Sequence, residues 1–72
     1  MKKIKKIKIT VNGKIKNIND KTKLSNLINS LKIPIKKVAI ELNQEIIDKK
    51  TLSNIKLQKN DKVEIVHFIG GG

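Results

Sequence analysis

Residues 64–72 read EIVHFIGGG, a run of strand-forming residues that passes directly into three glycines. Residues 63–69 are apolar or β-branched apart from one glutamate and one histidine, which predicts a buried strand. Gly70, Gly71 and Gly72 have no Cβ atom, so they cannot pack and they prefer no single conformation. We therefore expect a buried strand that is followed by a thin, flexible tail.

A glycine tail at the end of a chain can deliver its terminal carboxylate to another protein. Extended from Ile69, the tail reaches roughly 13 Å at the usual rise per residue, which is enough to enter an active site. The alternative is a frayed end or a tag remnant. Because the glycines follow the strand without a linker, we favour the functional interpretation. We divide the chain into a domain at 1–69 and a flexible C-terminal glycine tail at 70–72.

The composition limits the other functions that the chain can have. With 72 residues, it has room for one domain with a small core and no room for a substrate cleft. No apolar run approaches the roughly 20 residues of a membrane span, and the N-terminus lacks a signal-peptide core. We therefore expect a cytoplasmic protein that does not bind membranes. The absence of cysteine argues against a disulfide framework, a thiolate metal site and a thiol nucleophile.

The net charge of +11 would ordinarily suggest nucleic acid as a ligand. All 17 basic residues are lysines, however, so the arginine forks that read guanine edges are missing. Phe68 is the only aromatic residue that could stack on bases. We expect no specific nucleic-acid partner. A basic RNA-binding module with salt-sensitive, nonspecific affinity remains a distant alternative.

The first third of the chain predicts a β-hairpin. The pattern is strand-like from Ile4, and residues 6–11 alternate polar and apolar side chains, as a half-buried strand does. Asn12-Gly13 follows at once, and this dipeptide between two alternating runs indicates a type I′ turn. Residues 14–19 should then return antiparallel. We interpret the lysines on these strands as a solvated face that also protects against edge pairing.

A short amphipathic helix should follow the hairpin. Its apolar residues recur with helical spacing at Leu24, Leu27, Ile28 and Leu31. Residues 20–22 offer N-cap side chains, and Pro34 should end the helix. We expect the apolar stripe to cover the hairpin as part of the core.

The second half of the chain predicts three more strands. Residues 38–43 alternate again, residues 45–47 suggest a short edge strand after a tight Asn43-Gln44 turn, and residues 51–55 suggest one helical turn. The resulting order is that of an α+β fold, the β-grasp or ubiquitin-like fold. It has a mixed sheet of four to five strands with one main helix packed on one face. The last strand should lie centrally in this sheet, parallel to the first.

The side chains near the end of the last strand suggest a docking surface. If Val63 and Ile65 face the helix, alternation places Val66 and Phe68 on the opposite, open face of the sheet. Together with Ala39, they would form an apolar patch beside the tail for a partner protein. The alternative is that Phe68 only fills a sheet edge.

The sequence contains no glycine-rich phosphate loop, no metal cluster and no catalytic triad. His67 is the only histidine, and without a second ligand it makes no convincing metal site. Its place in the last strand suits packing or contact with a partner. We therefore assign no catalytic and no metal-binding residue.

Three segments of the chain resemble the ThiS family, the sulfur carrier proteins of thiamine thiazole synthesis. They are residues 38–43, residues 45–47 and the ending at 61–72, and the first half agrees with the family only as a pattern. The chain has Asp48-Lys49 where the family often has Pro-Arg, and Asn60-Asp61 where Gly-Asp is common. A terminal Gly-Gly would also fit the small subunit of molybdopterin synthase and other ubiquitin-like proteins.

The resemblance implies a carrier rather than an enzyme. A ThiF-like adenylating enzyme would join the Gly72 carboxylate to AMP from ATP, with Gly70 and Gly71 presenting it. Sulfur from a cysteine desulfurase route would displace AMP and leave a thiocarboxylate. A ThiG-like thiazole synthase would then build that sulfur into the thiazole ring.

In this scheme the activating partner uses the ATP, so the chain itself would bind no cofactor. We expect it to be monomeric when free. Two related functions remain open, namely sulfur delivery for molybdopterin and ubiquitin-like modification of lysines on other proteins.

Overall fold

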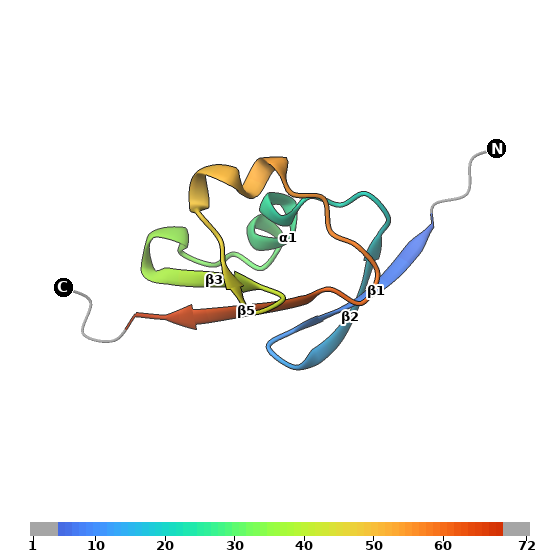
Figure 1. The fold of residues 1–72 in the computed structure, drawn as a ribbon, viewed down its shortest axis with the longest axis horizontal. Helices are drawn as coiled ribbons and strands as arrows, with labels where there is room; N and C mark the ends of the chain where they lie inside the picture. Colours follow the sequence, from blue (N-terminus) through green and yellow to red (C-terminus); the bar gives the residue numbers. More distant parts are fainter. Residues whose placement is uncertain (1–4, 69–72) are drawn as a thin grey trace.

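The structure, a computed structural model, describes residues 5–68. A sheet of five strands carries the α-helix on one of its faces (Figure 1). The strands are β1 (Lys6–Val11), β2 (Lys14–Asn19), β3 (Val38–Leu42), β4 (Glu45–Ile46) and β5 (Lys62–His67). The helices are α1 (Leu24–Ser30) and two short 3-10 helices, η1 (Ile35–Lys37) and η2 (Lys49–Asn54). Among residues 5–68, none of these helices has the length and apolar character of a membrane span.

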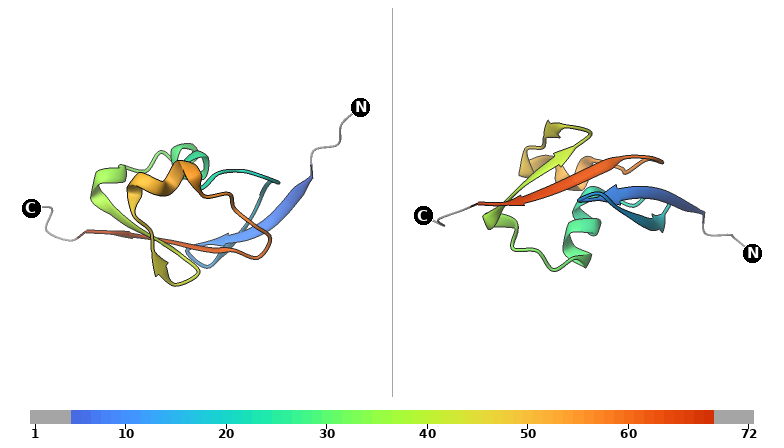
Figure 2. Two further views of the ribbon diagram at one scale, coloured as in Figure 1. Left: turned by 45° about the horizontal axis from the view of Figure 1, so that its top comes forward. Right: turned by 90° about the horizontal axis from the view of Figure 1, so that it is seen from below.

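The strand order is β2-β1-β5-β3-β4, so the last strand lies at the centre of the sheet. β5 runs parallel to β1 on one side and antiparallel to β3 on the other. The two views in Figure 2 show that β1 starts and β5 ends at opposite ends of the molecule. The predicted α+β, β-grasp arrangement is therefore confirmed.

Both predicted tight turns have a left-handed backbone, which the sequence predicted only for the first of them. Asn12 and Gly13 have φ values of 50° and 81°, and positive φ at both positions is the signature of a type I′ turn. Asn43 and Gln44, between β3 and β4, repeat this pattern with φ values of 52° and 72°. Both predicted hairpins form.

The predicted start of α1 is wrong, because no side chain of residues 20–22 caps it. The N-cap residue is Lys23, which makes no capping hydrogen bond. Instead, the Leu24 N–H donates to the carbonyl of Ile55 over 2.8 Å. The Thr22 hydroxyl donates to the Asn19 carbonyl in the turn before the helix. A distant backbone segment thus replaces the local cap, and sequence spacing cannot reveal this.

The end of α1 is set earlier than Pro34. The helix stops at Ser30, and Lys32 takes a left-handed conformation with φ of 56°. Its N–H donates to the Asn29 carbonyl over 3.1 Å, which tightens the last turn. Pro34 instead precedes η1 as its N-cap residue.

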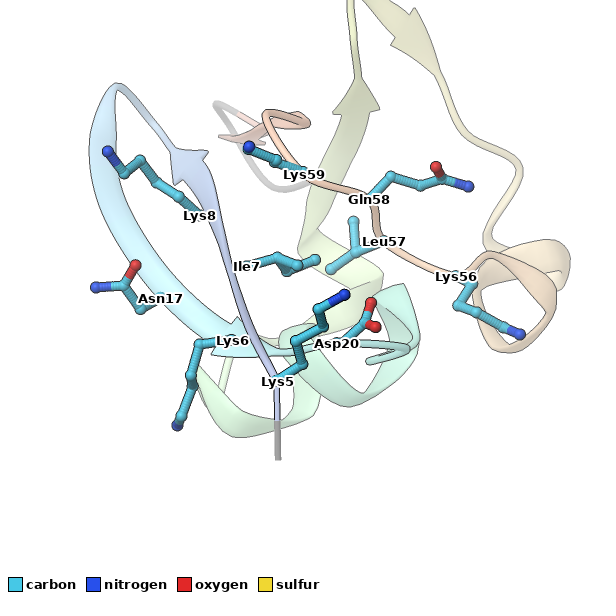
Figure 3. A pocket seen from close by; sticks show the side chains of 10 residues that line it. All are labelled: Lys5, Lys6, Ile7, Lys8, Asn17, Asp20, Lys56, Leu57, Gln58 and Lys59. Carbon is cyan, nitrogen blue, oxygen red and sulfur yellow. The ribbon is translucent and has the colours of Figure 1, made fainter. Parts of the chain in front are cut away.

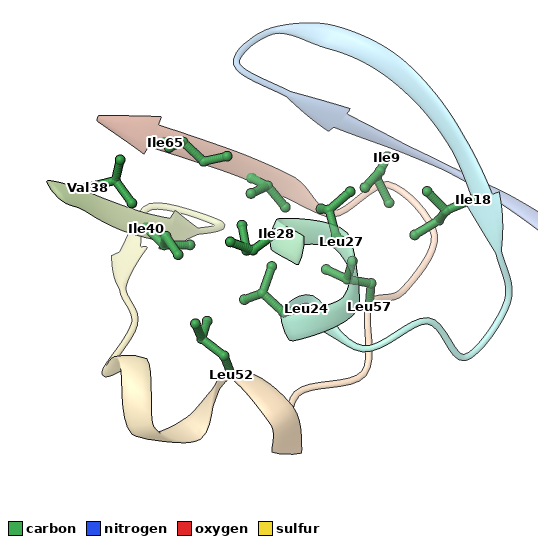
Figure 4. Packing of buried hydrophobic residues seen from close by; sticks show 11 residues of the cluster. Ile9, Ile18, Leu24, Leu27, Ile28, Val38, Ile40, Leu52, Leu57 and Ile65 are labelled. Atoms are coloured by element: carbon green, nitrogen blue, oxygen red, sulfur yellow. The ribbon is translucent and has the colours of Figure 1, made fainter. Parts of the chain in front are cut away.

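The core lies between α1 and the sheet (Figure 4). Leu24, Leu27 and Ile28 are buried as the helical stripe predicts, while Leu31 packs at its margin. The other buried residues are Ile9, Ile18, Val38, Ile40, Leu52, Leu57, Val63 and Ile65. No polar or charged residue within 5–68 is buried, so this small core depends on apolar burial alone.

Asn12 links the hairpin to the last strand. β1 pairs with β5 at only two positions, Thr10 with Lys62 and Val11 with Val63, before the chain turns away. Beyond them, the Asn12 N–H donates to the Val63 carbonyl over 2.9 Å. The Asn12 Oδ1 also accepts the Ile65 N–H over 2.7 Å. One side chain therefore extends the pairing of β5 after β1 has ended.

We expect Ile40→Ala to lower the free energy of unfolding by about 2–5 kcal/mol, because it removes fully buried carbons and leaves a cavity. Ile46→Ala is the matched control on the neighbouring strand, since Ile46 is 76% exposed, and it should change stability by less than about 0.5 kcal/mol. Urea denaturation followed by circular dichroism measures both. Equal effects of the two substitutions would contradict the assigned core.

We expect Asn12→Gly to cost about 1–3 kcal/mol, because glycine keeps the positive φ but leaves the part-buried Ile65 N–H without its acceptor. Asn12→Asp should lie close to the wild type, because a carboxylate oxygen can accept the same hydrogen bond. Thermal unfolding measures the two variants side by side. A loss of stability in the aspartate variant as large as that in the glycine variant would show that the acceptor is not the cause.

Candidate functional site

The last strand is paired with β3 as far as His67, and Phe68 is then held by η1. β5 ends at His67, and the Phe68 N–H still donates to the Lys37 carbonyl over 2.9 Å. The strand was predicted to include Ile69, which lies outside the described residues together with the three glycines. The roles assigned to Gly70, Gly71 and Gly72, and the flexibility of the tail, therefore stay predictions.

The side chains of β5 alternate between the core and the open face, by which we mean the sheet face opposite α1. Val63 and Ile65 are buried, whereas Glu64 and Val66 are exposed, which confirms the predicted orientation for these four residues. His67 and Phe68 are both exposed, so the alternation of burial ends at Val66. Val66 pairs directly with Ala39 of β3, so two of the three predicted docking residues touch each other across the strands.

Phe68 is not buried, but a lysine lies over the face of its ring. The Lys49 Nζ lies 5.3 Å from the centroid of its ring, which is within the range of a cation–π contact. Lys49 belongs to η2. It is part of the Asp48-Lys49 pair, which stands where the ThiS family often has Pro-Arg. The ring is nevertheless 56% exposed, so more than half of it can meet a partner. A docking role for Phe68 stays a prediction.

Asn12 and Lys49 are the residues near this site that sequence reasoning did not find. Asn12 was identified only as a turn residue, although it also holds Ile65 of the last strand. For Lys49, the sequence indicates a departure from the family that could alter how a partner docks, but it does not predict the contact with Phe68. Both contacts join segments that lie far apart in the sequence, so no local pattern indicates them.

His67 is exposed at the end of β5, opposite Val38. Of the two roles suggested for it, contact with a partner fits this exposure better than packing does. Within residues 5–68, no three side chains of the metal-binding types gather closely enough to hold a metal ion. The end of β5 can therefore hold the following residues in place, but the described side chains around it form no metal site.

A larger hollow, of about 680 Å³, opens at the start of β1 (Figure 3). Its lysines are Lys5, Lys6, Lys8, Lys56 and Lys59. Ile7 and Leu57 also line it, and Asp20 supplies the single carboxylate. This hollow lies at the end of the molecule away from the end of β5. Its positive charge attracts anions in general, but lysine ammonium groups offer no fork for base recognition.

The fold and sequence match known proteins. A sequence model of the ThiS family matches residues 9–72. The sulfur carrier protein ThiS of Bacillus subtilis is 38% identical over 89% of this chain and 98% of its own length. The crystal structure of a thiamine biosynthesis protein, ThiS from Geobacter metallireducens, superposes with a TM-score of 0.81. That protein is 29% identical, and the match covers 92% of this chain and all of the other.

Longer proteins contain a similar segment. A protein named thiazole synthase from Magnetococcus marinus is 39% identical over 92% of this chain, and a protein of the same name from Paramagnetospirillum magneticum is 36% identical. This chain spans about a fifth of the length of these two relatives. With the family match over most of its residues and the ThiS fold, the chain belongs to the ThiS family of sulfur carrier proteins.

Proposed function

We propose that this chain carries sulfur for thiamine biosynthesis as a thiocarboxylate on Gly72. The observation that supports the proposal most is the ThiS family match, which extends through the three glycines to residue 72. β5 supports it as well, because the strand is fixed between two neighbours and leads directly toward these glycines. Such a strand fixes the point from which the chain end is presented.

The chemistry begins with activation, since a carboxylate is a poor electrophile. In the proposed first step, the Gly72 carboxylate oxygen attacks the α-phosphorus of ATP and pyrophosphate leaves. The product is a mixed anhydride in which AMP is a good leaving group. A ThiF-like adenylating enzyme would supply the ATP site and the acid–base groups.

Sulfur then replaces AMP. A persulfide from a cysteine desulfurase route attacks the activated carbonyl carbon and expels AMP, which leaves an acyl disulfide. A thiol cleaves the sulfur–sulfur bond, and the thiocarboxylate remains on Gly72. The carrier contributes a tethered reacting atom, so that each transfer takes place inside a complex.

This role makes the chain a cosubstrate rather than an enzyme. We propose that it binds no cofactor of its own and works in the cytoplasm as a monomer between encounters with its partners. The proteins named thiazole synthase support a ThiG-like acceptor, because each contains a segment similar to this chain. Sulfur delivery for molybdopterin and transfer of the carboxylate to lysines would share the activation step and differ in the acceptor.

The exposed apolar residues beside the end of β5 support a docking patch for the activating enzyme. Val66 and Phe68 are half exposed, and Ala39 pairs with Val66. Exposed apolar side chains that form one contiguous patch, rather than lying singly, mark interaction surfaces. We propose that this patch seats the domain while the glycines enter the active site.

Intact-protein mass spectrometry tests the carrier function. After incubation with ATP, the ThiF-like enzyme of the same cells and a sulfur donor, we expect a mass gain equal to one oxygen exchanged for one sulfur. Fragmentation should place the gain on Gly72. Adducts on lysines of other proteins would instead favour a modifier, and an unchanged mass with an active enzyme would contradict the proposal.

A deletion of Gly71 and Gly72 is the matched negative control for the mass measurement. It should abolish the mass gain and leave the unfolding temperature unchanged, because both residues lie beyond the last strand. A mass gain that persists in the shortened chain would mean that the sulfur is carried elsewhere.

Phe68→Ala tests the docking patch. We expect it to lower kcat/KM for adenylation roughly tenfold, the scale of a truncated interface anchor. The unfolding temperature should fall only slightly, since 56% of the ring is already exposed. Ile15→Ala is the control, because Ile15 is 65% exposed on β2. Equal adenylation kinetics for the wild type and Phe68→Ala would contradict a docking role for Phe68.

A further inference from the structure

A lysine side chain lies against the single phenylalanine of the chain. The Lys49 Nζ is 5.3 Å from the centroid of the Phe68 ring, and a cation within about 6 Å of a ring centroid is attracted to the face of the ring. Lys49 is half-buried, whereas Lys50 beside it is exposed. These two neighbouring lysines therefore have different surroundings, although both carry the same charge.

The backbone from which the Lys49 side chain starts is fixed. Asp48 is the N-cap residue of η2, and its side chain accepts the Lys50 N–H over 3.0 Å. The Thr51 hydroxyl donates to the Asp48 carbonyl over 2.7 Å. Leu52, which is only 7% exposed, anchors η2 in the core (Figure 4). Lys49 therefore extends from a short helix that is held at its start and by its buried leucine.

The backbone of Phe68 is fixed as well. Its N–H donates to the Lys37 carbonyl over 2.9 Å, and the Lys37 N–H donates to the Pro34 carbonyl over 2.9 Å within η1. The cation–π contact thus joins two segments that are each held by their own hydrogen bonds. The freedom that remains to Phe68 is the rotation of its side chain. The ammonium group of Lys49 favours the rotamer that turns a ring face toward it.

An ordered ring suits a docking surface better than a mobile one. An exposed side chain that is first ordered on binding loses conformational freedom, and this loss weakens the complex. A ring that is already held in place loses less. The contact with Lys49 still leaves 56% of Phe68 exposed, so it orders the ring without covering the surface that a partner would meet.

We propose that Lys49 is a positioning residue for adenylation, because its ammonium group holds the Phe68 ring in the orientation in which the ring meets the adenylating enzyme. This inference rests on the proposed function and adds the residue that prepares the docking patch. Lys49 acts here through Phe68, and neither through a bond of its own to the partner nor through the net charge of the chain. These three roles give different results in the experiment below.

Lys49→Met tests the inference, since it removes the charge and keeps a long aliphatic side chain. Each variant is first shown to be folded by circular dichroism. With the ThiF-like enzyme of the same cells, we expect KM for the carrier to rise roughly two- to fivefold, the scale of an exposed cation–π contact. The value of kcat should stay unchanged. Lys49→Arg should restore a KM close to that of the wild type, because a guanidinium group also stacks on an aromatic face.

Lys50→Met is the matched control, because it removes the neighbouring charge and keeps the backbone N–H that binds Asp48. It should leave KM unchanged, and an equal rise in KM would attribute the effect to net charge and overturn the inference. Lys49→Met is also combined with Phe68→Ala. In this background it should have no further effect on KM. A further rise would mean that Lys49 binds the partner by itself, which would also overturn the inference.

Nuclear magnetic resonance tests the contact without the enzyme. The side-chain protons of Lys49 should be shifted upfield by the ring current of Phe68, and Phe68→Ala should abolish this shift. Absence of the shift in the wild type would overturn the inference. So would an unchanged KM of Lys49→Met when the wild type is adenylated. Failure of an active enzyme to adenylate the wild type would instead overturn the proposed function itself.

Discussion

The central position of β5 is the constraint on which the rest of this structure depends. The strand completes the sheet by joining the β1–β2 hairpin to β3, and its buried residues Val63 and Ile65 belong to the core beneath α1. The same strand carries Val66, one of the residues proposed for docking, and it precedes the three glycines in the sequence. A substitution in β5 can therefore affect both the stability of the core and the position from which the chain continues into the glycines.

Asn12 shows how the fold meets this demand. β1 can pair with β5 over only two residues, because its hairpin turn must begin at once. Asn12 in the turn then continues the contact with β5. Its backbone N–H donates to the Val63 carbonyl, and its side-chain oxygen accepts the Ile65 N–H. Asn12 therefore permits the left-handed turn and also fixes β5, so that it links the first hairpin to the last strand.

Lysines lie at both ends of the sheet. They surround the hollow at the start of β1, and Lys37 and Lys49 contact Phe68 just after the end of β5. The net charge of +11 is therefore spread over the molecule and does not by itself mark one end of the sheet as a binding surface.

The sequence by itself determined the order of the elements, the two tight turns and the alternation that buries Val63 and Ile65 and exposes Val66. These features follow from local rules, since strand periodicity and turn chemistry operate over a few residues. Residue by residue, the ending also indicated the ThiS family.

Only the tertiary structure decided how α1 begins and which side chains meet across the strands. Leu24 donates to Ile55, which is why the helix needs no cap from residues 20–22. The pairing of Glu41 with Glu64 and the contact of Lys49 with Phe68 also join distant segments. Their physical reason is the same: each contact joins residues from different elements, whereas periodicity and turn chemistry act over only a few residues.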